Sequence, residues 1–289
     1  MRHPRSHGLF AVAAVALVAF IVTFQPTSAQ SANDAEELRK GRNFIPTRVF
    51  TLEQDQQLLK LYEGLFVADV ADGMDALGLQ NIGSMSPDIM PLWKDYEHFR
   101  HRFVGIAVTV RYVPTNEPPA GRMESTEAYD RWSGNWYSRK STEPFIPLIR
   151  PGTAVMIEDA DRVDVGTIGS NNILDWVERG AVGVVTSTTA RDTDEVAAQK
   201  VPLYLKAPGK GIRPGRNEVE SVNRPIVVGG VLVEPGDVIV ADGDGVICVP
   251  RDHAEAVAKY AKRILDERQQ GRKAAYERLG LPKDPSIKP

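Results

Sequence analysis

Two side chains of opposite charge, Arg191 and Asp192, come three residues after the apolar segment 180–187, GAVGVVTS. Neighbours in a strand point to opposite faces, so the two charges need not pair and can contact different parts of one ligand. A guanidinium binds a carboxylate or enolate oxygen with two donors, and an aspartate without a histidine or cysteine neighbour suits Mg²⁺. These residue types predict a site where a divalent metal at Asp192 and the cation of Arg191 stabilise the enolate of a small 2-oxo acid.

The segment before this strand is predicted to position the pair. Gly166 and Gly169 precede an expected helix that begins near Ser170 or Asn171, and glycine lets backbone approach a ligand closely. The unpaired amides of a first helical turn attract a carboxylate, so Gly169, Ser170, Asn171 and Asn172 are the predicted substrate-binding residues. The strand 181–187 then returns and delivers Arg191 beyond its carboxyl end, where ligands of such sheets bind.

An ordinary alternative exists for the same residues. An Arg-Asp pair after a strand is commonly a surface salt bridge with no ligand. The loop at 164–169 lacks the full GxGxxG pattern and a Walker lysine, so nucleotide binding is disfavoured.

The surrounding elements predict a mixed α/β domain. Thr51 with Gln54 fits a capping box for a helix in which Leu58, Leu59, Leu61, Tyr62 and Leu65 form the core face. Gly78 and Gly180 end two further helices, and a long charged helix covers 252–277. Strands are expected in FVGIAVTVRYVP, TAVMIED, AVGVVTS, VPLYLKA and the β-rich segment 225–250. The segment 114–147, rich in Pro, Gly, charge and aromatics, is predicted to run over the surface as an insertion with a short helix.

Several of these motifs carry a resemblance to a known family. The chain resembles the RraA-like proteins, which include class II 4-hydroxy-4-methyl-2-oxoglutarate aldolases and oxaloacetate decarboxylases. The similarity covers roughly residues 52–262, apart from 114–147, and lies in these motifs: VADVADGMDALG, FVGIAVTV, PLIRPGTAVMIED, GAVGVVTSTTARD and RPIVVGGVLVEPGDVIVADGDGVICVP.

The resemblance implies a fold, an assembly and a set of roles. The fold is an α/β/β/α sandwich resembling the swivelling phosphohistidine domain, assembled as a homotrimer. Arg191 matches the arginine that holds substrate and stabilises the enolate, and Asp192 matches the aspartate associated with the metal. Residues 169–172 match the loop and helix start whose backbone holds the substrate carboxylate. The implied activity is cleavage of a C–C bond of a small 2-oxo acid, by retro-aldol reaction or decarboxylation.

The chain departs from the family at one metal position. Aldolases of the family carry an acid 21 residues before the arginine, and this chain has Ser170 there. The usual Asp-Gly after the strand is replaced by Ser187-Thr188. Loss of an anion weakens Mg²⁺ binding unless Asp159 or Asp175 compensates. The alternative function is therefore a non-catalytic ligand-binding or regulatory protein on the same scaffold.

The amino terminus predicts export. Residues 1–29 have a basic start, an apolar run from Leu9 to Phe24 and small residues up to Ala29, which is the layout of a signal peptide. The apolar run is short for a membrane span, which needs roughly 20 residues, although an uncleaved anchor is the alternative. We expect a flexible leader over 30–50, a single domain over 51–289, and a periplasmic or secreted protein.

Charge and the remaining motifs add little chemistry. The net charge of −3 disfavours a nucleic-acid surface, and the single cysteine, Cys248, is expected to be buried and inert. We interpret the Asp242–Gly245 segment as a hairpin turn and both His98 and His101 as surface residues. The basic loop at 206–216 is an anion-binding loop or, as we favour slightly, a solvated connection. Its cations are Lys206, Lys210, Arg213 and Arg216.

Overall fold

The computed structural model describes residues 35–160 and 164–287, and the chain divides into two compact units, residues 1–44 and 45–289. The predicted signal peptide, residues 1–29, lies outside the described residues. Within the described ranges, no helix is both long and apolar enough to cross a membrane.

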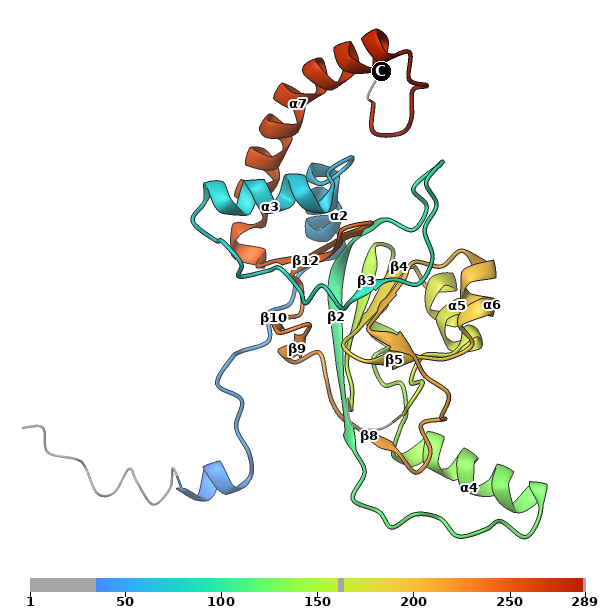
Figure 1. Ribbon diagram of the computed structural model, residues 1–289. Helices are drawn as coiled ribbons and strands as arrows, with labels where there is room; N and C mark the ends of the chain where they lie inside the picture. Colours follow the sequence, from blue (N-terminus) through green and yellow to red (C-terminus); the bar gives the residue numbers. More distant parts are fainter. Residues whose placement is uncertain (1–34, 161–163, 288–289) are drawn as a thin grey trace, which may run out of the picture. The chain divides into compact units, whose positions relative to one another are not determined.

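A mixed sheet of eight strands forms the centre of this unit (Figure 1). The strands run in the order β1-β6-β4-β3-β2-β11-β12, with β8 paired to β2. Contacts among β2, β3, β4 and β6 are parallel, and β1, β8, β11 and β12 pair antiparallel to their neighbours. The strand bounds are Met90–Pro91 (β1), Phe103–Pro114 (β2), Thr153–Glu158 (β3), Ala181–Thr186 (β4), Leu203–Leu205 (β6), Asn217–Val222 (β8), Val238–Asp242 (β11) and Gly245–Val249 (β12).

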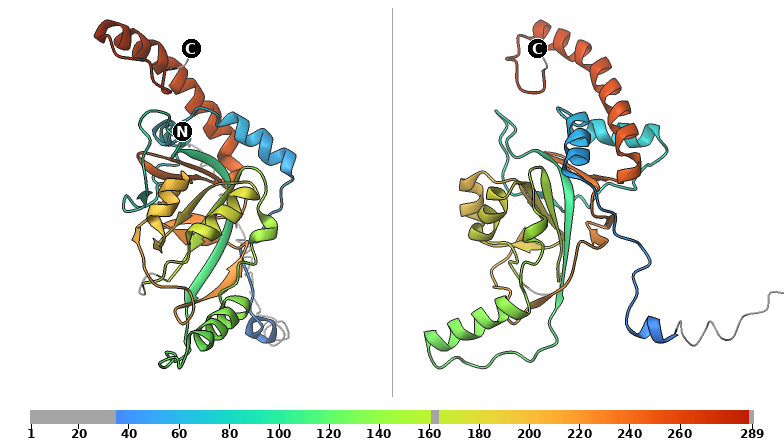
Figure 2. Two further views of the ribbon diagram at one scale, coloured as in Figure 1. Left: turned by 90° about the vertical axis from the view of Figure 1, so that its right-hand side faces the viewer. Right: turned by 180° about the vertical axis from the view of Figure 1, so that it is seen from behind.

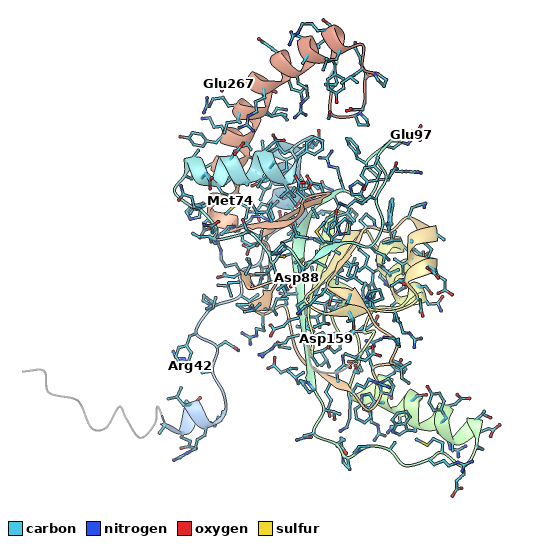
Figure 3. All side chains as sticks on the ribbon, viewed as in Figure 1. Arg42, Met74, Asp88, Glu97, Asp159 and Glu267 are labelled. Carbon is cyan, nitrogen blue, oxygen red and sulfur yellow. The ribbon has the colours of Figure 1, made fainter. Side chains whose placement is uncertain are left out.

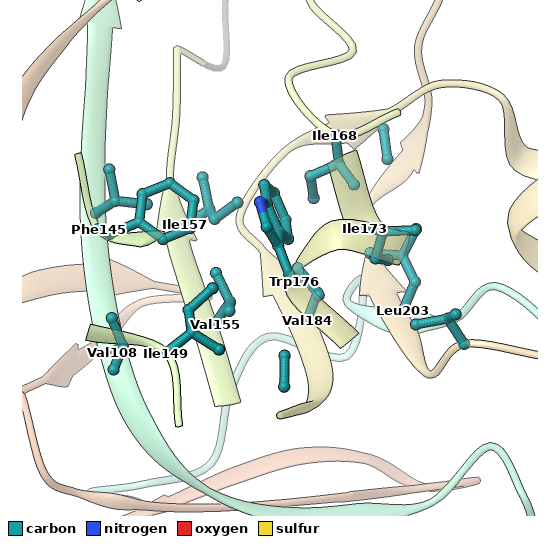
Figure 4. Packing of buried hydrophobic residues seen from close by; sticks show 14 of the residues in the cluster. Val108, Phe145, Ile149, Val155, Ile157, Ile168, Ile173, Trp176, Val184 and Leu203 are labelled. Carbon is teal, nitrogen blue, oxygen red and sulfur yellow. The ribbon is translucent and has the colours of Figure 1, made fainter. Parts of the chain in front are cut away.

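Three apolar clusters separate four layers, which confirms the predicted α/β/β/α sandwich. One cluster joins the helices α5 (Ser170–Glu178) and α6 (Thr193–Gln199) to the outer face of β2, β3 and β4, with Trp176 at its centre (Figure 4). A second fills the space between the β2–β3–β4–β6 and β11–β12 parts of the sheet. The third lies beneath α2, α3 and α7, on the other side of β11 and β12 (Figure 2).

The helices that cover the third cluster follow from the sequence, with one correction. Their bounds are Leu52–Leu61 (α2), Val67–Ala76 (α3) and Ala254–Leu279 (α7). The capping box of Thr51 and Gln54 is present. Leu58, Tyr62 and Leu65 are buried as predicted, but Leu61 is 44% exposed. The assignment of Leu61 to the core face was wrong because a residue adjacent to Tyr62 points about 100° away from it on a helix.

The segment 114–147 carries a fourteen-residue helix, α4 (Thr126–Arg139), whose first turn is capped by the Ser125 side chain. Trp136 on this helix is buried, and its indole donates to the backbone oxygen of Asn217 at 3.0 Å. The helix is followed by a short 3-10 turn, η1 (Ile146–Leu148), which leads into β3. The segment therefore packs on β8 through its aromatic face.

The remaining elements are short. Two small sheets pair β9 with β10 and β5 with β7. Their bounds, with the last 3-10 turn, are Thr189–Ala190 (β5), Ala207–Pro208 (β7), Ile226–Val228 (β9), Val231–Val233 (β10) and Arg251–His253 (η2). The pair β5–β7 matters for the site, because β5 ends immediately before Arg191.

Candidate functional site

Arg191 and Asp192 lie beside the loop that begins α5, as the sequence predicted. Ala190 forms a parallel bridge with Ile168, and the Arg191 amide donates to the Ile168 carbonyl at 2.9 Å. Both side chains are partly exposed, at 35% for Arg191 and 29% for Asp192. The β5 backbone therefore holds the two charged residues against residues 166–169.

The two glycines before α5 make room for this pair. A methyl group built on Gly166 would lie 2.5 Å from the Arg191 Cβ, closer than any real contact allows. A methyl group on Gly169 would lie 2.8 Å from the Asp192 Oδ2 and 3.3 Å from the Asn172 Oδ1. The glycines therefore leave the space that the Arg191 and Asp192 side chains occupy, in addition to any space for a ligand.

Arg191 and Asp192 form the ion pair that the sequence offered as the ordinary alternative to two charges facing different parts of a ligand. The Arg191 Nε lies 3.5 Å from the Asp192 Oδ1. The strand β5 ends at Ala190, and Asp192 has φ of 56°, in the left-handed region, so the alternation of a strand no longer applies. The Asp192 carboxylate also accepts the Ser170 amide at 3.1 Å. The acid therefore joins the arginine to the amino terminus of α5.

The remaining first-turn amides of α5 face no acceptor within the helix. Gly169 is the N-cap residue, and the first intrahelical bond runs from Ile173 to its carbonyl. The amides of Asn171 and Asn172 precede that bond, so both are available to an anion. The helix start, Arg191 and Asp192 form one contiguous polar surface.

Ser170 occupies the position where the resemblance implied an acid, and no described carboxylate replaces it. Asp175 pairs instead with Arg179 at 3.1 Å on the outer side of α5. Asp159 is buried in a separate polar network. Over residues 35–160 and 164–287, no three His, Cys, Asp or Glu side chains gather where they could hold a metal ion. Asp192 is thus the acid that accepts a first-turn amide of α5, and this single carboxylate does not by itself make a resident divalent-metal site.

A second polar cluster adjoins the first through Asn172. The Asn172 Nδ2 donates to Glu143 Oε1 at 2.6 Å, and the Trp176 indole donates to Glu143 Oε2 at 3.0 Å. The Arg213 guanidinium completes the cluster with a 2.6 Å contact to Glu143 Oε1 and a 3.2 Å contact to the Tyr112 hydroxyl. Glu143 thus accepts three donors, two from α5 and one from the loop that carries Arg213.

Arg213 was not predicted to be buried, because we favoured a solvated connection for its loop. Its side chain is only 6% exposed and that of Glu143 is 13% exposed. Burial disfavours the charged guanidinium, but the Tyr112, Glu143 and Tyr137 oxygens outweigh it and raise the pKa of Arg213. The cation therefore stays charged inside the protein, with Glu143 as its counter-ion.

A cavity of about 420 Å³ opens beside this cluster. It is lined by Tyr137, Ser141, Thr142, Glu143, Asn172 and Arg213. Four of these residues come from the segment 114–147, which has no counterpart in the motifs of the resemblance. Sequence reasoning missed the cavity because Glu143 and Arg213 are 70 residues apart and no local pattern links them.

The cavity wall is supported from behind by buried Asp159, labelled in Figure 3. Its carboxylate accepts Asn217 Nδ2 at 2.8 Å, the Ala160 amide at 2.7 Å and the Thr167 hydroxyl. Asn217 in turn accepts the Ser141 hydroxyl at 2.9 Å. Burial raises the pKa of Asp159 despite these hydrogen bonds. This network fixes Ser141 at the cavity.

The other sequence candidates lie elsewhere. His98 is exposed as expected, but His101 is buried, which corrects its assignment to the surface. Its ring lies edge-on to Trp93 and Phe99, and its Nδ1 accepts the Asp95 amide at 3.0 Å. The segment 242–245 is the predicted hairpin turn, and Cys248 is buried.

The rest of the basic loop is spread over three environments. Lys206 is exposed and lines a separate cavity of about 630 Å³ near the ends of β3 and β4. Lys210 is 85% exposed and lies 3.7 Å from Asp164. The Arg216 guanidinium donates to the carbonyl of Ile212. Arg213 is therefore the member of the loop that reaches the candidate site.

The fold and this site define a mixed α/β protein of the RraA type. The family model described as "RraA-like: Aldolase/RraA" matches residues 67–248. The chain belongs to the RraA-like family.

Relatives and solved structures agree with this assignment. Protein DlpA of Legionella pneumophila is 23% identical over 79% of this chain and 34% of its own length. The 4-hydroxy-4-methyl-2-oxoglutarate aldolase of Thermus thermophilus is 34% identical over 34% of this chain and 60% of its own length. The chain thus spans between about a third and three fifths of the length of these two curated relatives.

Two solved structures share the fold. An uncharacterized protein from Pseudomonas syringae has a TM-score of 0.60 at 25% identity and covers 78% of this chain and 94% of its own. Streptomyces coelicolor RraAS2 is described as an unusual member of the RNase ES inhibitor RraA protein family. It has a TM-score of 0.57 at 19% identity and covers 75% of this chain and 96% of its own.

Proposed function

We propose that this protein is a lyase that cleaves a C–C bond of a small 2-oxo acid, by retro-aldol reaction or decarboxylation. The single observation that carries the proposal is the placement of Arg191 beside the start of α5. Membership of the RraA-like family and the aldolase names of several relatives support it.

The roles follow from the geometry. The substrate carboxylate binds the amides of Asn171 and Asn172 in the segment 169–172, because the Ser170 amide already donates to Asp192. Arg191 holds the keto oxygen, where negative charge develops as the enolate forms. Asp192 keeps the guanidinium in place through the 3.5 Å contact and anchors the helix start through the Ser170 amide.

The reaction conserves atoms and electrons without an added oxidant. In the retro-aldol reaction, the C3–C4 bond breaks and its electron pair becomes the enolate of pyruvate. The 4-hydroxyl loses its proton as the new carbonyl forms, and C3 of the enolate gains a proton. In decarboxylation, the bond between C3 and the distal carboxylate breaks and CO₂ leaves. The same enolate of pyruvate remains and is protonated at C3. Arg191 stabilises the negative oxygen in both cases.

Mg²⁺ dependence is part of the sequence hypothesis and stays a prediction. Asp192 alone does not make a resident metal site, so any Mg²⁺ would be brought by the substrate, whose carboxylate and keto oxygens chelate it, with Asp192 contacting it through water. Such an ion supplies electrostatic stabilisation of the enolate. No step above depends on it.

Export and assembly belong to the same proposal. The layout of residues 1–29 supports a periplasmic or secreted protein, and the resemblance to the family supports a homotrimer. Cell fractionation and analytical ultracentrifugation test the two statements. A cytoplasmic protein with an intact amino terminus would overturn the first, and a monomer at micromolar concentration would overturn the second.

The experiment that tests the activity compares native protein with Arg191→Ala. Pyruvate release from oxaloacetate and from 4-hydroxy-4-methyl-2-oxoglutarate is measured with and without Mg²⁺. We expect a loss of about 10²–10³-fold in kcat, the effect of removing one donor to a developing oxyanion. The control is Arg179→Ala, since Arg179 pairs with Asp175 on the outer side of α5. Equal rates for native protein and Arg191→Ala would reject the role of Arg191.

A binding protein without catalysis is the second candidate, and Ser170 in place of an acid favours it. Calorimetry with pyruvate or 2-oxoglutarate separates the two. Binding that is lost in Arg191→Ala, together with no pyruvate release from either substrate, would establish the non-catalytic role.

A further inference from the structure

We infer that the cavity beside α5 is a subsite for the distal end of the substrate, and that it selects a neutral polar tail over a second carboxylate. This inference rests on the proposed function, because it assigns the 2-oxo acid end to Arg191. It names a substrate class: monocarboxylic 2-oxo acids that carry a hydroxylated or aromatic tail, which can undergo the retro-aldol reaction of the proposed function but not its decarboxylation.

The cavity and the Arg191 surface share a wall. The Asn172 side chain points its Oδ1 toward Gly169, beside the Asp192 carboxylate, and donates through Nδ2 to Glu143. One side chain therefore separates the two polar groups. A ligand held at the start of α5 meets Asn172 first, and its tail has the cavity of about 420 Å³ beyond that residue.

The charge of the cavity is already balanced. Arg213 is the cation in its lining, and Glu143 lies 2.6 Å from its guanidinium. Both side chains are largely buried, so solvent does little to screen a third charge. A second carboxylate on the substrate would be attracted by Arg213 and repelled by Glu143 at nearly the same distance. The net attraction that a dicarboxylate needs is absent.

The remaining groups suit a neutral tail. Tyr137 places its ring 5.1 Å from the Arg213 guanidinium, which gives the cavity an aromatic wall. Thr142 and Asn172 add uncharged polar groups. Hydroxyl groups on a ligand can bond to these residues and to the edge of Glu143, and an aromatic tail can stack on Tyr137.

The test uses 2-oxopentanoate and 2-oxoglutarate, which have equal chain length and differ in the distal carboxylate. Calorimetry on the full chain is expected to show that native protein binds 2-oxopentanoate about tenfold more tightly than 2-oxoglutarate. A tenfold ratio of dissociation constants corresponds to about 1.4 kcal/mol. Glu143→Gln removes the negative charge and keeps an acceptor oxygen, so it should shift the preference toward 2-oxoglutarate by about tenfold or more. Glu218→Gln is the control, since Glu218 contacts Lys140 and Thr115 outside the cavity lining.

The outcomes separate this inference from the proposed lyase activity. Tighter binding of 2-oxoglutarate by native protein, or an unchanged preference in a folded Glu143→Gln, would overturn the inference even if pyruvate release is normal. Absence of pyruvate release from 4-hydroxy-2-oxopentanoate, which carries a single carboxylate, together with the expected binding preference would reject the lyase and keep the subsite. If Glu143→Gln does not fold, the preference of native protein decides.

Discussion

The amide of Ser170 donates to the carboxylate of Asp192 at 3.1 Å, so the anion at the amino terminus of α5 is supplied by the protein itself. A negative group at this position is stabilised by the helix dipole and by the unpaired amides of the first turn. The same contact brings Arg191 to the helix start through its neighbour. The pair Ser170–Asp192 therefore links the structural role of the helix terminus to the chemistry proposed for Arg191.

The first prediction concerns a metal at this contact. Ser170→Asp places a second carboxylate beside Asp192, and the two charges repel each other unless a cation lies between them. We expect the variant to be less stable than native protein without Mg²⁺. With Mg²⁺ at ten times its dissociation constant, linkage stabilises the variant by about 1.4 kcal/mol, which raises Tm by about 4 °C.

Differential scanning calorimetry with and without Mg²⁺ measures this effect. Ser138→Asp on the exposed face of α4 is the control for an added charge. The native protein is expected to show no Mg²⁺-dependent shift in the absence of substrate. A shift of several degrees in native protein would instead establish a resident ion and contradict the assignment.

The second prediction concerns the buried pair of Glu143 and Arg213. Removal of one member leaves the other charge buried without its partner, which costs about 3–5 kcal/mol. Glu143→Ala and Arg213→Ala should each lower the free energy of unfolding by that order. The double variant should lose less free energy of unfolding than the two single variants lose together, because no unpaired charge remains in it.

Urea unfolding followed by circular dichroism measures the three variants. A double variant whose loss equals the sum of the single losses would show that the two residues do not act as a pair. Such a result would also remove the charge balance on which the neutral subsite depends.

The parts of this site that sequence reasoning predicted are local. The unit from Gly166 to Asp192 is one loop, the helix α5 and the strands β4 and β5 in direct succession, so its periodicity and glycines place Arg191 next to residues 169–172. The pairing of Arg191 with Asp192 was one of two alternatives that the sequence left open. It depends on a left-handed residue after a two-residue strand, and no residue type in TARD requires that conformation. The apolar patterns predicted a mixed α/β domain, and the order of its layers was implied by the family resemblance.

The parts that could not be predicted are long-range. Glu143 comes from the segment before β3, and Arg213 comes from the loop before β8. Their contact depends on α4 packing against β8 through Trp136, a tertiary fact with no sequence period. The assignment of His101 to the surface was wrong for the same reason, because the loop that covers this residue is not regular structure. Charged residues that pair across such distances look like solvated residues in the sequence.

The third prediction concerns the close approach at Gly169. Gly169→Ala adds a methyl group 2.8 Å from the Asp192 carboxylate oxygen and 3.3 Å from Asn172 Oδ1, so both side chains must move. We expect pyruvate release to fall by up to about 10²-fold, as for a displacement of about 1 Å at a reacting site. Gly134→Ala on α4 meets no atom within 4 Å and should stabilise the helix by about 0.5–1 kcal/mol. Steady-state kinetics and Tm are measured for both, and equal activity of native protein and Gly169→Ala would contradict the proposed geometry.

The fourth prediction concerns Asp159, whose burial raises its pKa above the ordinary value of 3.8. An acid with a raised pKa in the folded state binds its proton more tightly there than in the unfolded chain. Its favourable contribution to stability is therefore complete below pH 3.8 and is lost as the pH rises through the folded value. Asp159→Asn carries no such charge, so the free energy of unfolding of the variant minus that of native protein should increase with pH across this window. The slope is at most about 1.4 kcal/mol per pH unit.

Urea unfolding at half-unit steps between about pH 3.5 and 7 measures this difference for Asp159→Asn, with exposed Asp130→Asn as the matched control. The expected curve for Asp159→Asn is low at acidic pH, rises through the window and then levels. The absolute value of this free-energy difference depends on how well an amide replaces the carboxylate as the acceptor of Asn217 and Thr167. Its slope with pH does not, because the slope reports only the difference in bound protons. A flat curve, or one that falls with pH, would mean that hydrogen bonds to the carboxylate outweigh its burial. In that case Asp159 would hold the cavity wall through Ser141 as a stable anion, and its negative charge would add to that of Glu143 beside Arg213.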